Sequence, residues 1–441
     1  MSPSGPGEPD DIGGPGTPGT PGGTQPAPER DPGPDAPWPS PPPSPPGLTA
    51  WRFVVVFGTV SLLMDFVYEG ARSVTGPFLA HLGASAAVVG VVTGAGEAAA
   101  LGLRLVSGPL ADRTGRFWGW TIAGYALTAA SVPLLGLTGV LWAACALVVA
   151  ERVGKAVRSP AKDTLLSHAT AATGRGRGFA VHEAMDQVGA LIGPLTVAGV
   201  LAVTGGDYAP AFGVLAVPGV VALALLVWLR ARVTDPAAYE RASRRSAARA
   251  PDPPGGAAER PRLPRAFWVY AAFTAVTLLG FATFGVLSFH LVTRHLLPTA
   301  AVPVLYAAAM VADAVSALAT GWLYDRHGPR VLVVLPLLSA VVPVLAFAGS
   351  TAVVVLGALV WGAAVGVQES TLRATVADLV APGRRATAYG VFAGVMGGAA
   401  LAGGALTGVL YEVSVPALIT VVACVQAAAL VLLWRTQASD T

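Results

Sequence analysis

Several ionisable side chains lie inside long apolar stretches of the sequence, where a charge is costly and usually serves a function. Asp65, Glu69 and Arg72 are spaced i, i+4 and i+7, so a helix would carry all three on one face. The remaining residues of this kind are Glu97, Arg104, Glu151, Arg152 and Asp313. Glu97 and Arg104 are again seven residues apart, and these groups together are the first candidates for chemistry.

Three roles are open to these charges: ion pairs between helices, contacts to a substrate, and transfer of protons. A carboxylate in a medium of low dielectric holds its proton up to higher pH, whereas a neighbouring arginine opposes this effect. Asp65 and Glu69 can therefore alternate between a state paired with Arg72 and a protonated state. Structural pairing at a cytoplasmic gate is the favoured interpretation for a further group of charges, namely His182, Glu183, Asp186, Glu369 and Arg373.

The composition indicates a bilayer as the solvent for the elements that carry these charges. Of the 441 residues, 54% are hydrophobic and only 12% are charged, whereas about a quarter of a soluble globular chain is charged. From Trp51 onward, apolar stretches that can cross ~30 Å of hydrocarbon as helices follow one another. The predicted spans are 51–79, 85–111, 117–137, 139–166, 177–203, 208–231, 265–293, 299–322, 330–348, 352–378, 385–411 and 415–435. The predicted fold class is an all-α polytopic membrane protein, with twelve transmembrane helices in two six-helix bundles.

The fourth predicted span carries a stripe of charged residues that extends beyond Glu151. Lys155, Arg158 and Lys162 follow at helical spacing, with Arg152 beside the stripe. The position of the span predicts that only Glu151 and Arg152 lie deep in the membrane.

The chain outside the spans divides into a tail, a linker and short loops. Residues 1–48 are rich in Pro, Gly, Ser and Thr and are predicted to be disordered, and residues 233–264 form an arginine-rich linker between bundles at 49–232 and 265–436. Of the Lys and Arg residues outside the spans, only Arg294 lies on the side opposite the tail and linker. The positive-inside rule places both termini and the linker in the cytoplasm, and it explains the arginine run better than nucleic-acid binding does.

One short loop occurs twice, once in each predicted bundle. Gly108 to Arg116 reads GPLADRTGR where the second span turns into the third, and Gly321 to Arg330 reads GWLYDRHGPR where the eighth turns into the ninth. A second pair, GALIGP from Gly189 and GAALAGG from Gly398, also occupies corresponding spans. Two repeats in matching positions indicate a duplicated six-helix unit.

These loops resemble the G-x-L-x-D-R-x-G-R motif of the major facilitator superfamily, and the resemblance covers Trp51 to Arg435. The first copy matches at Gly108, Leu110, Asp112, Arg113, Gly115 and Arg116, and the second at Gly321, Leu323, Asp325, Arg326 and Gly328, with Pro329 inserted before Arg330. Gly108 is expected to let helices approach closely, and Gly115 to permit a tight turn. The resemblance implies a conformational latch that holds the cytoplasmic side shut, and this role falls to Asp112 and Arg116.

The fifth predicted span contains Gly189-x-x-x-Gly193-Pro194, which is similar to the exporter signature G-x-x-x-G-P-x-x-G-G of the family. Val197 and Ala198 stand where the paired glycines of that signature occur, so the match is partial. The motif implies export, while ordinary helix packing is the alternative explanation.

The resemblance implies a secondary transporter with alternating access for a small molecule, expected to be a monomeric, proton-coupled efflux antiporter in the cell membrane. An importer of the same family and a non-transporting sensor with this fold are the alternatives. The chain has no P-loop motif and no metal-ligand spacing, so no cofactor, metal or enzyme activity is expected. Three roles are open to four aromatic residues near the centre of the spans: they line an apolar cavity, they face lipid, or they pack between helices. These residues are Phe281, Phe284, Trp361 and Tyr125.

Overall fold

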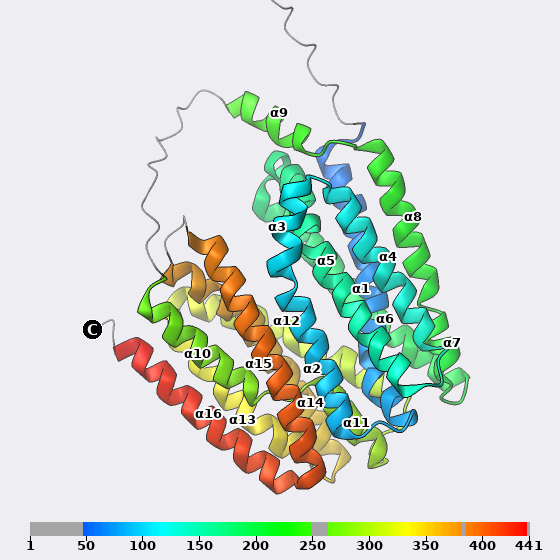
Figure 1. Cartoon of the computed structure of the whole chain (residues 1–441), viewed down its shortest axis with the longest axis vertical. Helices are drawn as coiled ribbons and strands as arrows, with labels where there is room; N and C mark the ends of the chain where they lie inside the picture. Colours follow the sequence, from blue (N-terminus) through cyan, green and yellow to red (C-terminus); the bar gives the residue numbers. More distant parts are fainter. Residues whose placement is uncertain (1–46, 248–262, 381–383, 439–441) are drawn as a thin grey trace, which may run out of the picture. The chain divides into compact units, whose positions relative to one another are not determined.

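The computed structural model describes residues 47–247, 263–380 and 384–438, and every regular element in these residues is a helix, as predicted. The tail predicted to be disordered, apart from its last two residues, and residues 248–262 of the predicted linker lie outside this part. Apart from one helix in the linker, the described helices overlap the predicted spans in order (Figure 1).

The first half of the chain forms the helices of the first six predicted spans. They are α1 (Ala50–His81), α2 (Ala86–Gly102) with α3 (Arg104–Thr114), α4 (Phe117–Leu135), α5 (Leu141–Thr173), α6 (Arg175–Val203), and α7 (Tyr208–Gly213) with α8 (Ala216–Arg232). The second half forms α10 (Arg265–Leu279) with α11 (Phe284–Thr293), α12 (Ala301–His327), the 3-10 helix η1 (Gly328–Val333) with α13 (Val334–Ala346), α14 (Thr351–Leu379), α15 (Arg385–Val413) and α16 (Val415–Ala438). Each half has its own apolar core clusters.

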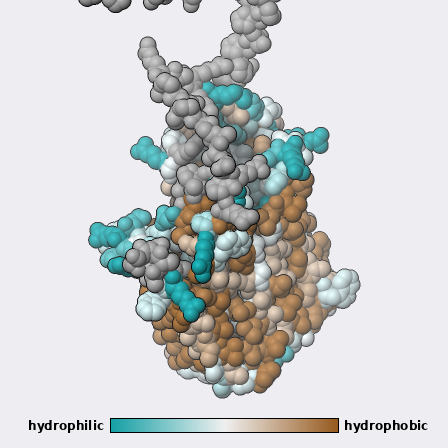
Figure 2. Space-filling model, turned by 60° about the vertical axis from the view of Figure 1, so that its left-hand side comes forward, coloured by the Kyte–Doolittle hydropathy of each residue, from teal (hydrophilic) through white to brown (hydrophobic). Residues whose placement is uncertain are grey.

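The chain is a multi-pass membrane protein. Within the described residues, nine segments are long and apolar enough to cross a bilayer. One of them, Ala301–Ala346, contains both α12 and α13, while α4 and α5 do not qualify. The charged stripe of α5 explains its exclusion. Figure 2 shows apolar residues over most of one face, with hydrophilic residues gathered toward one end.

The predicted seventh span is interrupted, because α10 ends at Leu279 and α11 begins at Phe284. Side chains from other helices bind the carbonyl groups that this break frees. Trp361 Nε1 donates to the carbonyl oxygen of Ala282 at 2.8 Å, and Gln426 Nε2 donates to that of Thr277 at 2.9 Å. Backbone at membrane depth must find such partners within the protein, so these two side chains stabilise the break.

The linker contains a helix that the sequence analysis did not predict, α9 (Ala237–Ala247), which packs against α5. Tyr239 is buried, and its hydroxyl donates to the Leu48 carbonyl oxygen at 2.7 Å. Burial raises the pKa of the Tyr239 phenol to about 12, so it stays a donor at neutral pH. His168 Nδ1 lies 2.7 Å from Glu240 Oε2. The interpretation of residues 233–264 as a simple solvated linker is therefore wrong for α9.

The two ends of the helix assembly differ in how closely the halves approach. We call the end that carries α9 and the loop at Gly115 the linker side, and the opposite end the far side (Figure 1). The halves pack most extensively through α2 and α15. At the far-side ends of these helices, a Cβ atom added to Gly90 would lie only 2.1 Å from the Gly404 carbonyl oxygen. Glu412 Oε1, on α15, accepts a hydrogen bond from the Ala87 amide at 2.8 Å. The structure is closed on the far side.

Candidate functional site

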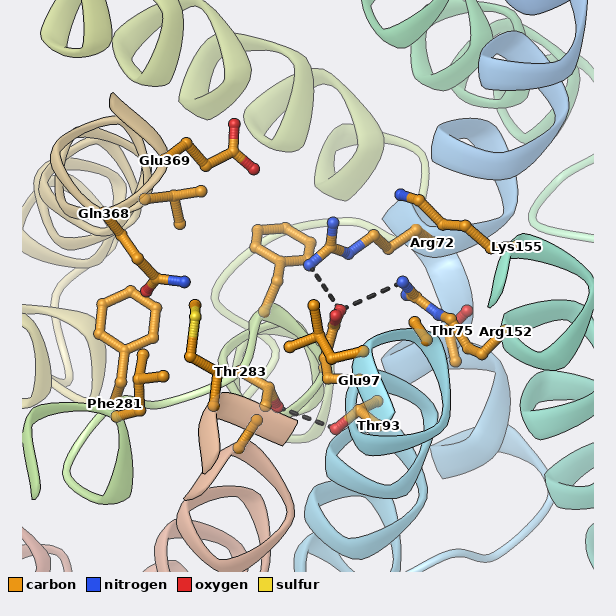
Figure 3. Close-up of a pocket in the computed structure, with 18 of the residues that line it drawn as sticks. Arg72, Thr75, Thr93, Glu97, Arg152, Lys155, Phe281, Thr283, Gln368 and Glu369 are labelled. Atoms are coloured by element: carbon orange, nitrogen blue, oxygen red, sulfur yellow. Dashed lines mark hydrogen bonds and ion pairs between the residues drawn. The ribbon is translucent and has the colours of Figure 1, made fainter. Parts of the chain in front are cut away.

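A central cavity of about 220 Å³ lies between the two halves. Helices α1, α2, α3 and α5 supply the wall from the first half, and α10, α11, α14 and α15 supply the wall from the second. The first-half wall is polar and consists chiefly of Tyr68, Arg72, Thr75, Thr93, Glu97, Arg104, Arg152 and Lys155. Figure 3 shows six of these side chains converging from separate helices: Arg72, Thr75, Thr93, Glu97, Arg152 and Lys155.

Helical periodicity explains how the sequence builds this wall. Tyr68, Arg72 and Thr75 follow one another at i, i+4 and i+7 along α1, and Thr93 and Glu97 are four residues apart on α2. Residues at these spacings share one face of a helix. The charged faces of three helices therefore meet at one place in the membrane, whereas each helix presents apolar residues elsewhere.

The second-half wall is mainly apolar and includes three aromatic residues. Phe281 lies in the break between α10 and α11, with its ring centroid 6.3 Å from that of Trp361. The Phe284 centroid lies 5.3 Å from the Trp361 centroid. Met396, Gln368 and Glu369 also line this side. Of the three readings open to the central aromatic residues, lining a cavity holds for Phe281, Phe284 and Trp361. Tyr125 is not among the lining residues.

Glu97 joins two arginines at the centre of the polar wall. Its Oε1 atom accepts from Arg72 Nη2 and from Arg152 Nη1, each at 3.1 Å, and Figure 3 shows the carboxylate between the two guanidinium groups. Arg152 Nε also lies 3.2 Å from Glu151 Oε2. The bridge ties α1, α2 and α5 together.

A second contact connects the charged network to the other half. The Tyr306 hydroxyl on α12 donates to Glu69 Oε2 on α1, and Glu69 Oε1 lies 3.8 Å from Arg72 Nη1. The Tyr306 ring packs against Phe284, with centroids 4.6 Å apart. One tyrosine thus touches both the aromatic wall and the carboxylate next to Arg72.

We expect Tyr306→Phe to lower the midpoint of thermal unfolding by several degrees. The ring still packs, but a hydrogen bond to a charged group, worth about 1.5–3 kcal/mol, is lost. Tyr125→Phe is the matched control, because the buried Tyr125 hydroxyl has no hydrogen-bond partner among the described residues. Unfolding of the purified protein in detergent, followed by intrinsic fluorescence, measures both. Equal midpoints for the two variants would contradict the assigned role of the Tyr306–Glu69 contact.

The predicted charges divide into those that line the cavity and those that do not. Arg72, Glu97, Arg104 and Arg152 line it. Glu69 and Glu151 lie behind the lining and pair with the two central arginines. Asp65 pairs instead with Arg158, its Oδ1 atom 3.7 Å from Arg158 Nη2. The proposed pairing of Asp65 with Arg72 is therefore absent from the ion pairs of the described residues.

Charges nearer the linker side form a separate cluster within the first half. Asp186 Oδ2 lies 3.6 Å from Lys162 Nζ and 3.4 Å from His182 Nδ1. In the second half, Asp313 is buried on α12, and its Oδ1 atom has no hydrogen-bond partner among the described residues. Asp313 does not line the cavity.

Several residues that line the cavity were not predicted to do so from the sequence. Lys155 lies on the cavity wall, with Nζ 3.9 Å from the centroid of the Tyr68 ring, and Arg158 is buried, so the expectation that only Glu151 and Arg152 lie deep is wrong. Glu369 also lines the cavity, whereas it was expected at a gate. The side chain of Arg373, its predicted partner, lies outside the described residues. The helical stripe on α5 was the available signal for Lys155.

The repeated loops are exposed at the linker side. Gly115 has φ of 62°, which confirms its predicted role in the turn, and Gly328 in the second copy has the same φ. Asp112, Arg113 and Arg116 are exposed, as are Asp325 and Arg326. Asp112 has no ion pair among the described residues, so the structure does not show the contact that the predicted latch requires, and the latch stays a prediction.

Two predicted glycine roles differ in outcome. A Cβ atom on Gly108 would lie 3.8 Å from Pro160 Cβ, which is ordinary contact, so the close approach expected there is wrong. Gly189 and Gly193 do permit close packing, because a Cβ atom on each would lie 2.2 Å from the carbonyl oxygens of Leu62 and Phe66. Pro194 follows within α6. The fifth-span motif thus packs α6 against α1.

The chain belongs to the Major Facilitator Superfamily, whose family profile matches residues 59–309 and 297–440. Rv2265 of Mycobacterium tuberculosis is 64% identical over 394 residues, which cover 88% of this chain and 94% of that protein. This chain also matches the MFS-type transporter MJ1317 of Methanocaldococcus jannaschii over a shorter stretch. The two are 26% identical over 140 residues, which cover 32% of this chain and 35% of that protein.

Solved transporters share the fold. The nucleoside transporter NupG superposes with a TM-score of 0.63 at 14% identity, covering 88% of this chain and 98% of that one. A POT family transporter in complex with a thioalcohol-conjugated peptide gives a TM-score of 0.69 at 14% identity, covering 88% and 96%. A bacterial homologue of the lysosomal transporter Spinster gives 0.63 at 14% identity, covering 90% and 96%.

Proposed function

We propose that this protein is a proton-coupled secondary transporter, which moves a small solute through the central cavity by alternating access. The observation that carries the proposal is the Glu97 carboxylate between Arg72 and Arg152, in a cavity shared by both halves. When ionised, Glu97 neutralises the two guanidinium groups and ties three helices together. When protonated, it releases both arginines. Binding of a proton therefore frees two guanidinium groups at the place where a solute would bind.

Two contacts between the halves support alternating access as the mechanism. The close packing of α2 on α15 closes the far side, and the Tyr306–Glu69 hydrogen bond spans the halves beside the cavity. Rocking of one half against the other would break the far-side contacts and bring the exposed loops of the linker side together. We place the linker side in the cytoplasm of a cell-membrane protein, because its loops and linker carry the basic residues.

The direction of transport has two candidates, each favoured by a different observation. The partial motif at Gly189 to Pro194 favours export in exchange for protons. The Glu97 bridge favours import together with protons when the solute is an anion, because proton and anion then bind best together. Packing of α6 on α1 explains the glycines of this motif without any role in export. We therefore rank import with protons first.

Purified protein in liposomes that contain a pH-sensitive dye tests this function. We expect at least one member of a panel of anionic, neutral and cationic solutes to change the internal pH when it is added outside. The sign of the change distinguishes import with protons from exchange. Solute flux without a pH change would contradict proton coupling, and no flux of any solute would favour a non-transporting sensor.

A further inference from the structure

The charges of the central cavity are unevenly distributed between its two walls. Among the described residues, the basic lining residues are Arg72, Arg104, Arg152 and Lys155, and all of them come from the first half. The acidic lining residues of the described part are Glu97 and Glu369. Lys155 makes no ion pair among the described residues, and its ammonium group lies over the Tyr68 ring. A cationic solute would face four positive side chains, whereas an anionic one would meet donors from three helices.

The position of Glu97 shows where an anionic group fits. Two guanidinium groups converge on one carboxylate oxygen, each at 3.1 Å. Arginine donors form strong, directed hydrogen bonds to carboxylate, sulfonate and phosphate oxygens alike. Glu97 thus occupies the place that the anionic group of a solute would take.

The second-half wall suits a flat apolar group. Phe281, Phe284 and Trp361 line the cavity, and the indole N–H of Trp361 is already bound to the Ala282 carbonyl oxygen. These three residues therefore offer a solute apolar contact and no free hydrogen-bond donor. The cavity volume of about 220 Å³ is below the ~300–1,000 Å³ of pockets for drug-sized ligands, so the apolar body is small.

The surrounding charges determine how an anion can bind. The charged and titratable groups that face Glu97 or its partners are Tyr68, Glu69 and Arg72 on α1, Arg104 on α3, Glu151, Arg152 and Lys155 on α5, Tyr306 on α12 and Glu369 on α14. With Glu69 and Glu151 behind the wall, the described residues of this set comprise four cations and four carboxylates. An added anion would leave a net negative charge in a medium of low dielectric unless a proton enters with it.

We infer that the solute is a small organic anion with an aromatic or similarly flat apolar body, that its anionic group replaces the Glu97 carboxylate between Arg72 and Arg152, and that it binds together with one proton. This inference rests on the proposed function and names its substrate class. Protonation of Glu97 frees the two arginines, and the anion then binds them, so each step favours the other.

Binding of benzenesulfonate to the purified full chain in detergent tests the inference, because this aromatic anion stays ionised over the whole pH range. We expect its affinity to rise about tenfold for each unit of pH decrease, the limit for one linked proton. Phenyl phosphate should bind in the same way. Benzenesulfonamide, phenyltrimethylammonium and methanesulfonate, which lack the charge, reverse it or lack the ring, should each bind at least tenfold more weakly at low pH.

Variants separate this binding mode from nonspecific attraction. Glu97→Gln should bind benzenesulfonate tightly at every pH, since the arginines are permanently released, whereas Arg152→Gln should weaken binding about 100-fold. Asp163→Asn, which changes an exposed carboxylate on α5, should behave like the wild type. Equal binding of phenyltrimethylammonium, or benzenesulfonate binding that is indifferent to pH in the wild type, would overturn the inference. Proton-coupled flux of a cation or neutral solute in liposomes would overturn it while leaving the proposed function intact.

Discussion

Glu97→Gln is expected to abolish solute accumulation driven by a pH gradient while preserving solute exchange. A carrier coupled to one proton accumulates its solute about tenfold for each unit of pH difference, because one pH unit corresponds to about 1.4 kcal/mol. Glutamine cannot ionise, so the variant binds solute without binding a proton, and the accumulation ratio should fall to about one. Exchange of labelled for unlabelled solute at equal pH requires only alternating access, and it should persist.

Two controls make this result specific to Glu97. Asp163→Asn removes an exposed carboxylate from α5 and should accumulate solute as the wild type does. Arg152→Gln removes one partner of Glu97 and should abolish both accumulation and exchange, since it acts on solute binding. If Glu97→Gln still concentrates its solute in proportion to the pH gradient, another group carries the proton. Asp313, a buried carboxylate outside the cavity, would then be the next to replace.

The charged residues of the polar wall, apart from Lys155, were predictable from the sequence. Charged residues inside apolar stretches are rare because each is costly, so Arg72, Glu97, Arg104 and Arg152 could be recognised one by one. Their periodicity also indicated a shared face on each helix. The duplicated loops indicated which spans correspond, and therefore that the two halves enclose a central site.

Partners across helices were not predictable, because they depend on how the helices cross. Spacing along α1 suggested that Asp65 and Arg72 work together, whereas the crossing of α1 and α5 pairs Asp65 with Arg158. The depth of Lys155 was misjudged because the predicted span ended at 166, while α5 continues to Thr173. Extending the helix moves Lys155 toward the middle of α5, beside the cavity.

The linker helix α9 was not predicted from the sequence for a different reason. Residues 237–247 are rich in charge, and that composition concealed a buried face that includes Tyr239. Its ring lies 5.8 Å from the Phe53 ring of α1, a contact between segments far apart in the sequence. Most of the stability of a helix in a protein comes from packing of its amphipathic face, and not from its overall composition. Composition alone therefore underestimates structure in such a segment.

Gly90→Ala is expected to open the far side and to abolish transport. The added Cβ atom would lie 2.1 Å from the Gly404 carbonyl oxygen, a distance that requires α2 and α15 to move apart. Overpacking costs about 1–3 kcal/mol. Because the neighbouring atom belongs to the backbone and cannot rotate away as a side chain can, we expect a cost near the upper end of this range. A shift of ~3 kcal/mol changes the ratio of closed to open far side by about 100-fold.

Accessibility of a cysteine at Thr93 measures this shift, in a chain whose Cys145 and Cys424 are replaced by serine. A membrane-impermeant thiol reagent added on the far side should modify it about 100-fold faster in the Gly90→Ala variant, and Gly404→Ala should act in the same way. Gly398→Ala is the matched control on α15, because nothing lies within 4 Å of its added Cβ atom. It should leave transport unchanged, since alanine only favours the helix. Slow modification in Gly90→Ala together with normal flux would show that the α2–α15 contact is not the far-side gate.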